Sequence, residues 1–309
     1  MHRSLVPGSA ARSLILAAAC WGAGTVASKA ATAEFPPLTL LPLQLAASVG
    51  FLTVLMRLRG LPLRDPASPP ILGRLGLLNP GLAYALSLLG LTQITASLSV
   101  LLWAMEPVLI LGLAHVVLGE RLGRGLVGWS ALAVAGMLLV IQAPGTAGSW
   151  LGVGLTLAGV ACCALYTIVT RRWLAGADSA APVVLAQQLH ALVLAVCLAG
   201  AVWLAGGAVR ADGVSALGWA SALGSGVLYY AAAYWFYLSA LRRVPAAVAA
   251  TSFYLIPVFG VAGGQLLLSE RLTEGQWVGA AIVVAAVIVV LRRVGHDAAD
   301  VGPIGVTPA

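Results

Sequence analysis

Long stretches of apolar residues, separated by short polar or Gly- and Pro-rich segments, run through the whole chain. Examples are Leu14–Ala31, Ala96–Leu118, Pro245–Leu268 and Gln276–Leu291, which are close to the ~20 residues that cross a bilayer as a helix. These stretches lack the alternation of polar and apolar positions that a membrane β-barrel requires. The pattern therefore predicts an all-α integral membrane protein.

Dividing the chain at its charged, Pro-rich and Gly-rich segments predicts ten transmembrane helices. They cover residues 13–33, 37–56, 71–91, 95–118, 123–142, 150–170, 182–205, 214–241, 245–268 and 274–291. Only 9% of the residues are charged, against about 25% in a soluble domain. All four cysteines fall within apolar stretches without metal-type spacing, so we expect them to be reduced packing residues and predict neither a metal nor a cofactor.

The basic residues gather on one side of the predicted helices when both termini are placed in the cytoplasm. Of the 17 Lys and Arg residues, only Lys29, Arg210 and Arg271 then lie on the outer side, as the positive-inside rule requires. The net charge of +7 is thus explained by topology, and nucleic-acid binding is not expected. We expect a multi-pass protein of the cell inner (plasma) membrane, in contact with the lipid bilayer, as a monomer or a homodimer.

The second half of the sequence repeats the first at an offset of 150 residues. The matching positions include Tyr84 and Tyr234, Pro107 and Pro257, and Glu120 and Glu270. Five helices per half is an odd number, so the second half enters the membrane in the opposite sense. We therefore expect two inverted five-helix repeats at 13–142 and 150–292, followed by a short C-terminal tail at 293–309.

Two motifs with equal spacing carry a resemblance to a known family. Glu106-Pro107-Val108 is followed by Leu118-Gly119-Glu120-Arg121-Leu122, and Ile256-Pro257-Val258 by Leu268-Ser269-Glu270-Arg271-Leu272. With these motifs the chain resembles the drug/metabolite transporter superfamily, specifically its EamA-type members with ten helices. The resemblance implies ATP-independent transport, often efflux, of amino acids, metabolites or drugs through a central cavity. Gln44 departs from the family pattern, in which Arg is common at this position.

Glu106 is the most informative single residue because it lies midway along the fourth predicted helix. An ionisable side chain at that depth costs at least ~2.5 kcal/mol and normally faces a cavity or a partner. Glu106 can bind the amine of a substrate or exchange a proton; the alternative is a carboxyl held neutral by a structural hydrogen bond. Its equivalent in the second half is Ile256, and this asymmetry favours a specific role.

Further polar and aromatic side chains are expected at membrane depth, where apolar residues would suffice for packing. We predict that the substrate site contains Glu106, Tyr84, Tyr234, Trp103, Asn79, Tyr230 and Tyr254. Further candidates are Gln187 and the other aromatic residues of the eighth predicted helix, Tyr229, Trp235 and Tyr237. Pro107 and Pro257 are predicted to kink their helices, either for gating or as structural features. Lys29, His115 and His190 are expected to serve packing or interfacial hydrogen bonding, and Gly260 and Gly264 close helix contact.

Other classes of function fit the sequence less well. A membrane enzyme would need catalytic groups, but the chain has no HExxH or GxSxG motif and no second acid near Glu106 within the membrane. A channel would show a ring or filter of repeated polar groups. We therefore predict a secondary transporter that exports a small molecule by alternating access, with an importer or an exchanger of a polar metabolite as the alternative.

Overall fold

The computed structural model describes most of the chain, with gaps between residues 104 and 148 and in three later stretches. The described residues are 8–66, 68–103, 105–106, 108–110, 113, 116, 128–129, 131–132, 135–136, 139, 149–173, 180–207, 213–241, 253 and 255–300. The regular elements within these ranges are helical throughout. Their apolar composition places them in lipid, where a helix satisfies its own backbone hydrogen bonds.

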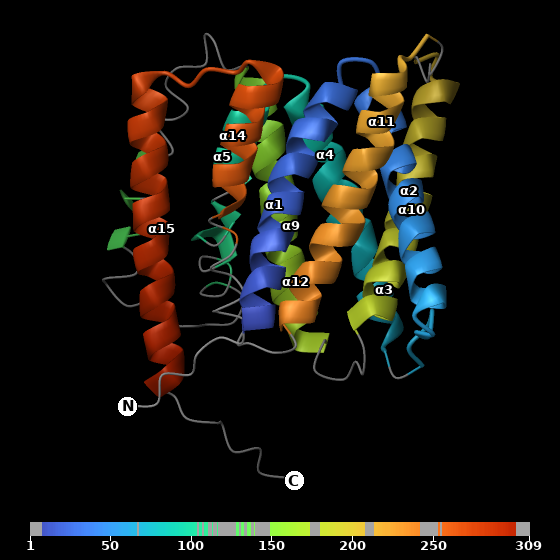
Figure 1. Ribbon diagram of the computed structural model, residues 1–309, viewed down its shortest axis with the longest axis horizontal. Coiled ribbons are helices and arrows are strands. Elements are labelled where there is room, and N and C mark those ends of the chain that lie inside the picture. Colours follow the sequence, from blue (N-terminus) through green and yellow to red (C-terminus); the bar gives the residue numbers. More distant parts are fainter. Residues whose placement is uncertain are drawn as a thin grey trace.

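The helices stand side by side with their axes roughly parallel (Figure 1). In the first half they are α1 (Gly8–Ala31), α2 (Pro37–Leu58), α3 (Pro70–Arg74), η1 (Leu75–Leu77), η2 (Leu78–Leu82), α4 (Ala83–Leu91) and α5 (Ala96–Trp103). In the second half they are α9 (Trp150–Trp173), α10 (Ala180–Leu204), α11 (Ala216–Ser225), η4 (Gly226–Ala232), α12 (Ala233–Leu241), α14 (Leu255–Leu268) and α15 (Glu274–Asp300).

Five stretches of helix within the described residues are long and apolar enough to cross a membrane. They are Ala10–Ala31, Pro37–Leu58, Pro70–Leu91, Trp150–Thr170 and Ala181–Leu204. The predicted total of ten stays a prediction, because most of 104–148 lies outside the described residues. The last helix was predicted to end at residue 291, but α15 continues to Asp300. Arg and other polar residues can extend a helix past the hydrocarbon region, since they favour helix and reach water.

Segments related by the 150-residue offset run in opposite directions. The α3–α4 segment rises from the lower end in Figure 1, whereas α11–α12 descends from the upper end. Both segments depart from the regular α-helix at the same place: η2 contains a kink at Asn79, whose backbone is not helical, and η4 is a π-helical stretch. Interruptions of this kind within a helix are often found at functional sites. The two halves thus share an irregular feature that the hydrophobic pattern did not predict.

Repeat-related glycines allow these two segments to pack directly against backbone. A Cβ atom on Gly76 would collide with the backbone of Gln187 in α10, and one on Gly226 with the backbone of Gln44 in α2. Gly76 lies in η1, directly before η2, and Gly226 begins η4, so each irregular stretch is held against a helix of the opposite repeat. Close approach through small residues is the usual way in which membrane helices pack.

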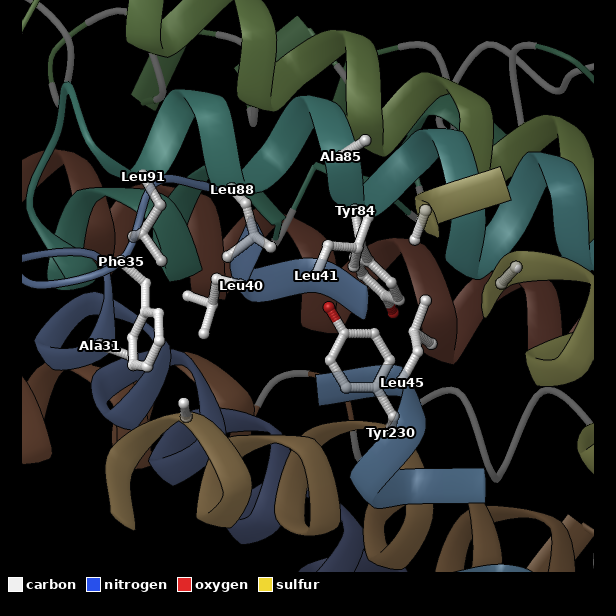
Figure 2. Packing of buried hydrophobic residues seen from close by; sticks show 13 residues of the cluster. Ala31, Phe35, Leu40, Leu41, Leu45, Tyr84, Ala85, Leu88, Leu91 and Tyr230 are labelled. Carbon is white, nitrogen blue, oxygen red and sulfur yellow. The ribbon is translucent and has the colours of Figure 1, made fainter. Parts of the chain in front are cut away.

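A large apolar cluster joins the two halves at the upper end of Figure 1. Figure 2 shows Phe35 and the leucines of α2 meeting Leu88 and Leu91 of α4, with the rings of Tyr84 and Tyr230 beyond them. Phe35, Leu40, Leu41 and Leu45 are at most 1% exposed. This packing fixes α2, α4 and η4 around the inner faces from which the candidate site is formed.

Candidate functional site

A cavity of about 210 Å³ lies between helices of the two halves. Its lining is mostly aromatic and apolar, with a few polar groups: Trp21, Thr25, Asn79, Tyr84, Val100, Trp103, Glu106, Cys163, Tyr166, Thr167, Thr170, Val183, Val184, Gln187, Tyr229, Tyr234, Tyr237, Phe253 and Ile256. Such a composition is typical of small-molecule sites. Drug-sized ligands generally occupy about 300 Å³ or more, so this volume suits a smaller molecule.

Residues related by the internal repeat face each other across the cavity. Four pairs at the 150-residue offset belong to its lining: Tyr84 and Tyr234, Trp103 and Phe253, Glu106 and Ile256, and Asn79 and Tyr229. The hydroxyl oxygens of Tyr84 and Tyr234 lie 3.0 Å apart in a mutual hydrogen bond. The cavity is therefore lined from both halves by residues that the internal repeat relates.

Asn79 enters the cavity where the helix is interrupted. Its backbone, with a φ of −144° and a ψ of 120°, is not helical, although it lies within η2. Its Nδ2 donates a hydrogen bond of 3.3 Å to the Tyr234 hydroxyl, and its buried Oδ1 has no hydrogen-bond partner among the described residues. A buried acceptor without a partner is costly, so Asn79 offers an acceptor that a ligand can satisfy.

Glu106 is half-buried and lines the same cavity as Asn79. Its Oε1 accepts a hydrogen bond of 3.3 Å from the thiol of Cys163 in α9. A thiol is a weak donor, so this contact leaves most of the hydrogen-bonding capacity of the carboxyl for another group. Glu106 therefore borders the cavity, while its depth in the membrane and its role remain predictions.

One face of α9 contributes polar residues that the sequence analysis overlooked. Cys163, Tyr166, Thr167 and Thr170 follow the spacing i, i+3, i+4 and i+7, which places them on one side of a helix. All four line the cavity, and the Tyr166 hydroxyl donates a 2.9 Å hydrogen bond to Gln187 Oε1. This periodic set within an apolar helix was the signal that identifies them. Cys163 is thus a cavity residue, and packing alone does not describe it.

The remaining predicted site residues line the cavity, lie beside it, or fall outside the described residues. Tyr84, Tyr234, Trp103 and Asn79 line the cavity, as does Gln187. Tyr230 does not: it is 2% exposed, packs in the cluster of Figure 2 and borders a smaller neighbouring pocket. Its neighbour Tyr229 takes the place in the cavity, because successive residues of a helix point about 100° apart.

Tyr254, Pro107 and His115 lie outside the described residues. Pro257 is buried within α14, one residue from the cavity residue Ile256. His190 Nδ1 lies 2.8 Å from the carbonyl oxygen of Ala186, one turn earlier in α10. His190 is not part of the described cavity lining.

Hydrogen bonds connect loops and helix ends at the upper end of Figure 1, beyond the cavity. Glu270 accepts hydrogen bonds from the backbone amides of Ala96, at 2.7 Å, and Ser97, at 2.9 Å, and from the Ser97 hydroxyl, at 2.6 Å. A carboxylate at a helix N-terminus satisfies free amides and opposes the helix dipole. Glu270 therefore attaches the segment after α14 to the start of α5, in the other half of the molecule.

Two further side chains connect helix ends and loops at the same end of the molecule. Lys29 Nζ donates hydrogen bonds of 2.7 Å to the carbonyl oxygens of Leu91 and Ile94, after α4. Glu34 accepts hydrogen bonds from Ser215 through both the backbone amide, at 2.6 Å, and the hydroxyl, at 2.7 Å. The side-chain hydrogen bond from Ser215, followed by the backbone one, holds the pKa of Glu34 below its usual value. Lys29 thus has the structural role expected for it.

Comparison with known proteins identifies the family. The EamA-like transporter family matches the chain twice, at residues 9–142 and 150–292. The chain belongs to the EamA-like transporter family. This EamA-type chain is therefore a multi-pass membrane protein of the drug/metabolite transporter type, with a small-molecule substrate, and its two family matches correspond to its two repeats.

Other comparisons support the fold of the EamA-type chain. A solved structure described only as "Crystal structure of protein" matches with a TM-score of 0.65, covering 93% of this chain and 98% of that chain. The two sequences are 18% identical, so the likeness concerns the fold alone. No curated protein matches the chain.

Proposed function

We propose that this protein is a secondary, ATP-independent transporter that exports a small metabolite, amino acid or drug by alternating access. The observation that carries the proposal is the cavity lined by repeat-related pairs such as Tyr84 and Tyr234. Two inverted halves with similar folds can exchange conformations, and a site on their shared axis is then exposed to each side in turn. An importer or an exchanger uses the same device, and direction of flux distinguishes them.

The Glu270 contact supplies a concrete element for alternating access. It joins the two halves beyond one end of the cavity through three hydrogen bonds to α5. At the other end, the lining extends to Thr170 and Val183, within a turn of the end of α9 and the start of α10. We propose that this arrangement is closed at the outer side and that Glu270 must release α5 when the outer side opens.

The proposed orientation places both termini in the cytoplasm of a cell whose inner membrane contains the protein. The test uses a variant without the four native cysteines and a single new cysteine at Ser68 or Gly148. An impermeant thiol reagent applied to intact cells is expected to label position 148 and spare position 68. The reverse labelling would overturn the orientation and, with it, the assignment of Glu270 to the outer side.

Opening at Glu270 is tested with Glu270→Gln, which removes the charge and keeps the shape. A cysteine replacing Thr25, which lines the cavity and is 6% exposed, reports access from outside in the same cysteine-free background. Labelling is expected to be at least about tenfold faster in Glu270→Gln, since hydrogen bonds to a charged group contribute ~1.5–3 kcal/mol. Glu274→Gln, an exposed acid in the first turn of α15, is the matched control.

Transport itself is measured in liposomes that contain no ATP. Amino acids, nucleosides and cationic drugs that raise the unfolding temperature of the purified protein are tested with outward and inward gradients. Flux down either gradient, slowed or uncoupled by Glu270→Gln, is expected. If compounds bind and none crosses the membrane, the protein is not a secondary transporter. If flux occurs only with the inward gradient, the protein is an importer.

A further inference from the structure

The cavity contains a single formal charge among the described lining residues. Glu106 is acidic, and the rest of that lining includes no Lys, Arg or His. A charge inside a membrane protein is stabilised by an opposite charge more than by any neutral group. Among the described lining residues, the cavity therefore offers a counter-ion to a cation and none to an anion.

Two hydrogen-bond acceptors in the cavity are open to a ligand. They are the carboxyl of Glu106 and the Oδ1 of Asn79, which has no partner in the described part of the chain. The hydroxyls of Tyr84 and Tyr234 bond to each other, and that of Tyr166 donates to Gln187. The buried Thr170 hydroxyl, which can donate or accept, also has no partner among the described residues, so the carboxyl of Glu106 decides which ligands the cavity favours.

Aromatic rings supply the remaining surface. The Tyr84 ring lies 5.6 Å from that of Trp103 and 5.1 Å from that of Tyr229, and Trp21 lies 5.5 Å from Tyr234. All five rings border the cavity. Such rings bury an apolar body and attract a cation through their electron-rich faces.

We propose that the cavity is a binding site for an organic monocation: an amine with an aromatic or apolar body and no carboxylate. Glu106 pairs with the ammonium group, Asn79 Oδ1 accepts one of its hydrogen bonds, and the rings cover the body. The inference rests on the proposed transport function and narrows its substrate. Amino acids are excluded because their carboxylate would lie near Glu106 without a cationic partner, at the cost of a buried unpaired charge.

A series of three ligands that differ chiefly in charge tests this assignment. The probes are 2-phenylethylamine, which is cationic, phenylalanine, which is zwitterionic, and 3-phenylpropionate, which is anionic. Binding to the detergent-purified full chain is measured by titration calorimetry near pH 7. The amine is expected to bind at least about tenfold more tightly than either of the others, the lower range for a desolvated charge pair.

Variants at Glu106 separate charge from shape. Glu106→Gln is expected to remove the preference for the amine, and Glu106→Asp to retain part of it. Glu274→Gln, outside the cavity, is expected to bind as the wild type does. Thermal unfolding without ligand verifies folding of each variant, and Glu106→Asp provides the test by its retained preference if Glu106→Gln does not fold.

The outcomes distinguish the substrate class from the transport function. Tighter binding of phenylalanine or 3-phenylpropionate, or an unchanged preference in Glu106→Gln, overturns the cation assignment even when flux is observed. Glu106-dependent binding of 2-phenylethylamine without flux in liposomes under either gradient supports the site and overturns the transporter proposal. Binding and flux of the amine, both lost in Glu106→Gln, support the two together.

Discussion

The two repeats resemble each other in frame and differ in chemistry. Tyr84 and Tyr234 occupy equivalent places and form a hydrogen bond with each other, and η2 and η4 interrupt equivalent helices. At the next equivalent pair, however, the first repeat presents the carboxyl of Glu106 and the second the aliphatic side chain of Ile256. The shared frame can support the movement that both halves must make, whereas the single acid gives the cavity a charged side and an apolar side.

Relocating the charge is the most severe test of this comparison. Glu106→Ile is expected to weaken binding of 2-phenylethylamine on the order of 10²-fold, the scale for truncating a buried charge partner. Adding Ile256→Glu moves the acid across the pseudo-two-fold axis and is expected to restore part of the affinity, because Ile256 lines the same cavity. Calorimetry on the single and double variants measures both effects. No recovery in a folded double variant would mean that position 106 acts through its particular surroundings.

Replacement of the glycine before η2 and of the glycine that begins η4 should destabilise the protein equally in the two halves. Gly76→Ala and Gly226→Ala force a methyl group into the backbone of Gln187 and Gln44, and overpacking typically costs ~1–3 kcal/mol. Both variants are expected to unfold at lower temperature in detergent. Gly224→Ala, two residues before Gly226, is the control, since a Cβ atom there would meet open space. Loss in one variant alone would show that the shared frame is not equally important in both repeats.

The prolines test whether the halves move in equivalent ways. Pro257 lies in the first turn of α14, where Pro257→Ala frees the backbone φ angle and supplies the N–H that Pro lacks, and Pro107→Ala is its partner in the repeat. Each is expected to slow flux several-fold per folded molecule, with ligand binding retained. Pro42→Ala, within α2 and outside the described cavity lining, is the control. Equal flux in all three variants would make the repeat-related prolines structural.

The smallest expected effect concerns the loop contact between Glu34 and Ser215. Because the pKa of Glu34 is lowered in the folded state, its contribution to stability is present at neutral pH and is lost as pH falls through that lowered pKa. The unfolding temperature of the wild type should therefore fall slightly more than that of Glu34→Gln below about pH 4, where free Glu titrates. Parallel decreases in both proteins would show that this contact contributes nothing measurable.

Sequence patterns predicted those features that depend on spacing alone. The 150-residue offset identified Tyr84 and Tyr234 before their contact was known, and the place of Glu106 in an apolar run pointed to a residue that borders the cavity. The same offset also relates Trp103 to Phe253, which was not used. The helical spacing of polar residues in α9 would have identified Cys163 and Tyr166, but only apolar residues were searched for such spacing.

Other features depend on three-dimensional contacts that no spacing reveals. Tyr229 and Tyr230 are adjacent in sequence and equivalent in chemistry, yet only Tyr229 faces the cavity. The direction of each ring depends on how η4 is rotated against α2 and α4, and the π-helical turn changes that rotation. Likewise, the motif around Glu270 is visible in the sequence, but its attachment to Ala96 and Ser97 becomes apparent only when the loops meet.

The seam between α1 and α14 bears on where a ligand can enter. A Cβ atom on Gly22 would lie 2.7 Å from the backbone nitrogen of Gly260, and one on Gly263 3.0 Å from the side chain of Val26. The backbones of the two helices are thus nearly in contact, and a molecule dissolved in the hydrocarbon cannot pass between them at these positions. A solute dissolved in the bilayer therefore cannot enter the cavity between α1 and α14. On this side of the molecule, the rate of entry depends on the concentration of the solute in water and not on its concentration in lipid.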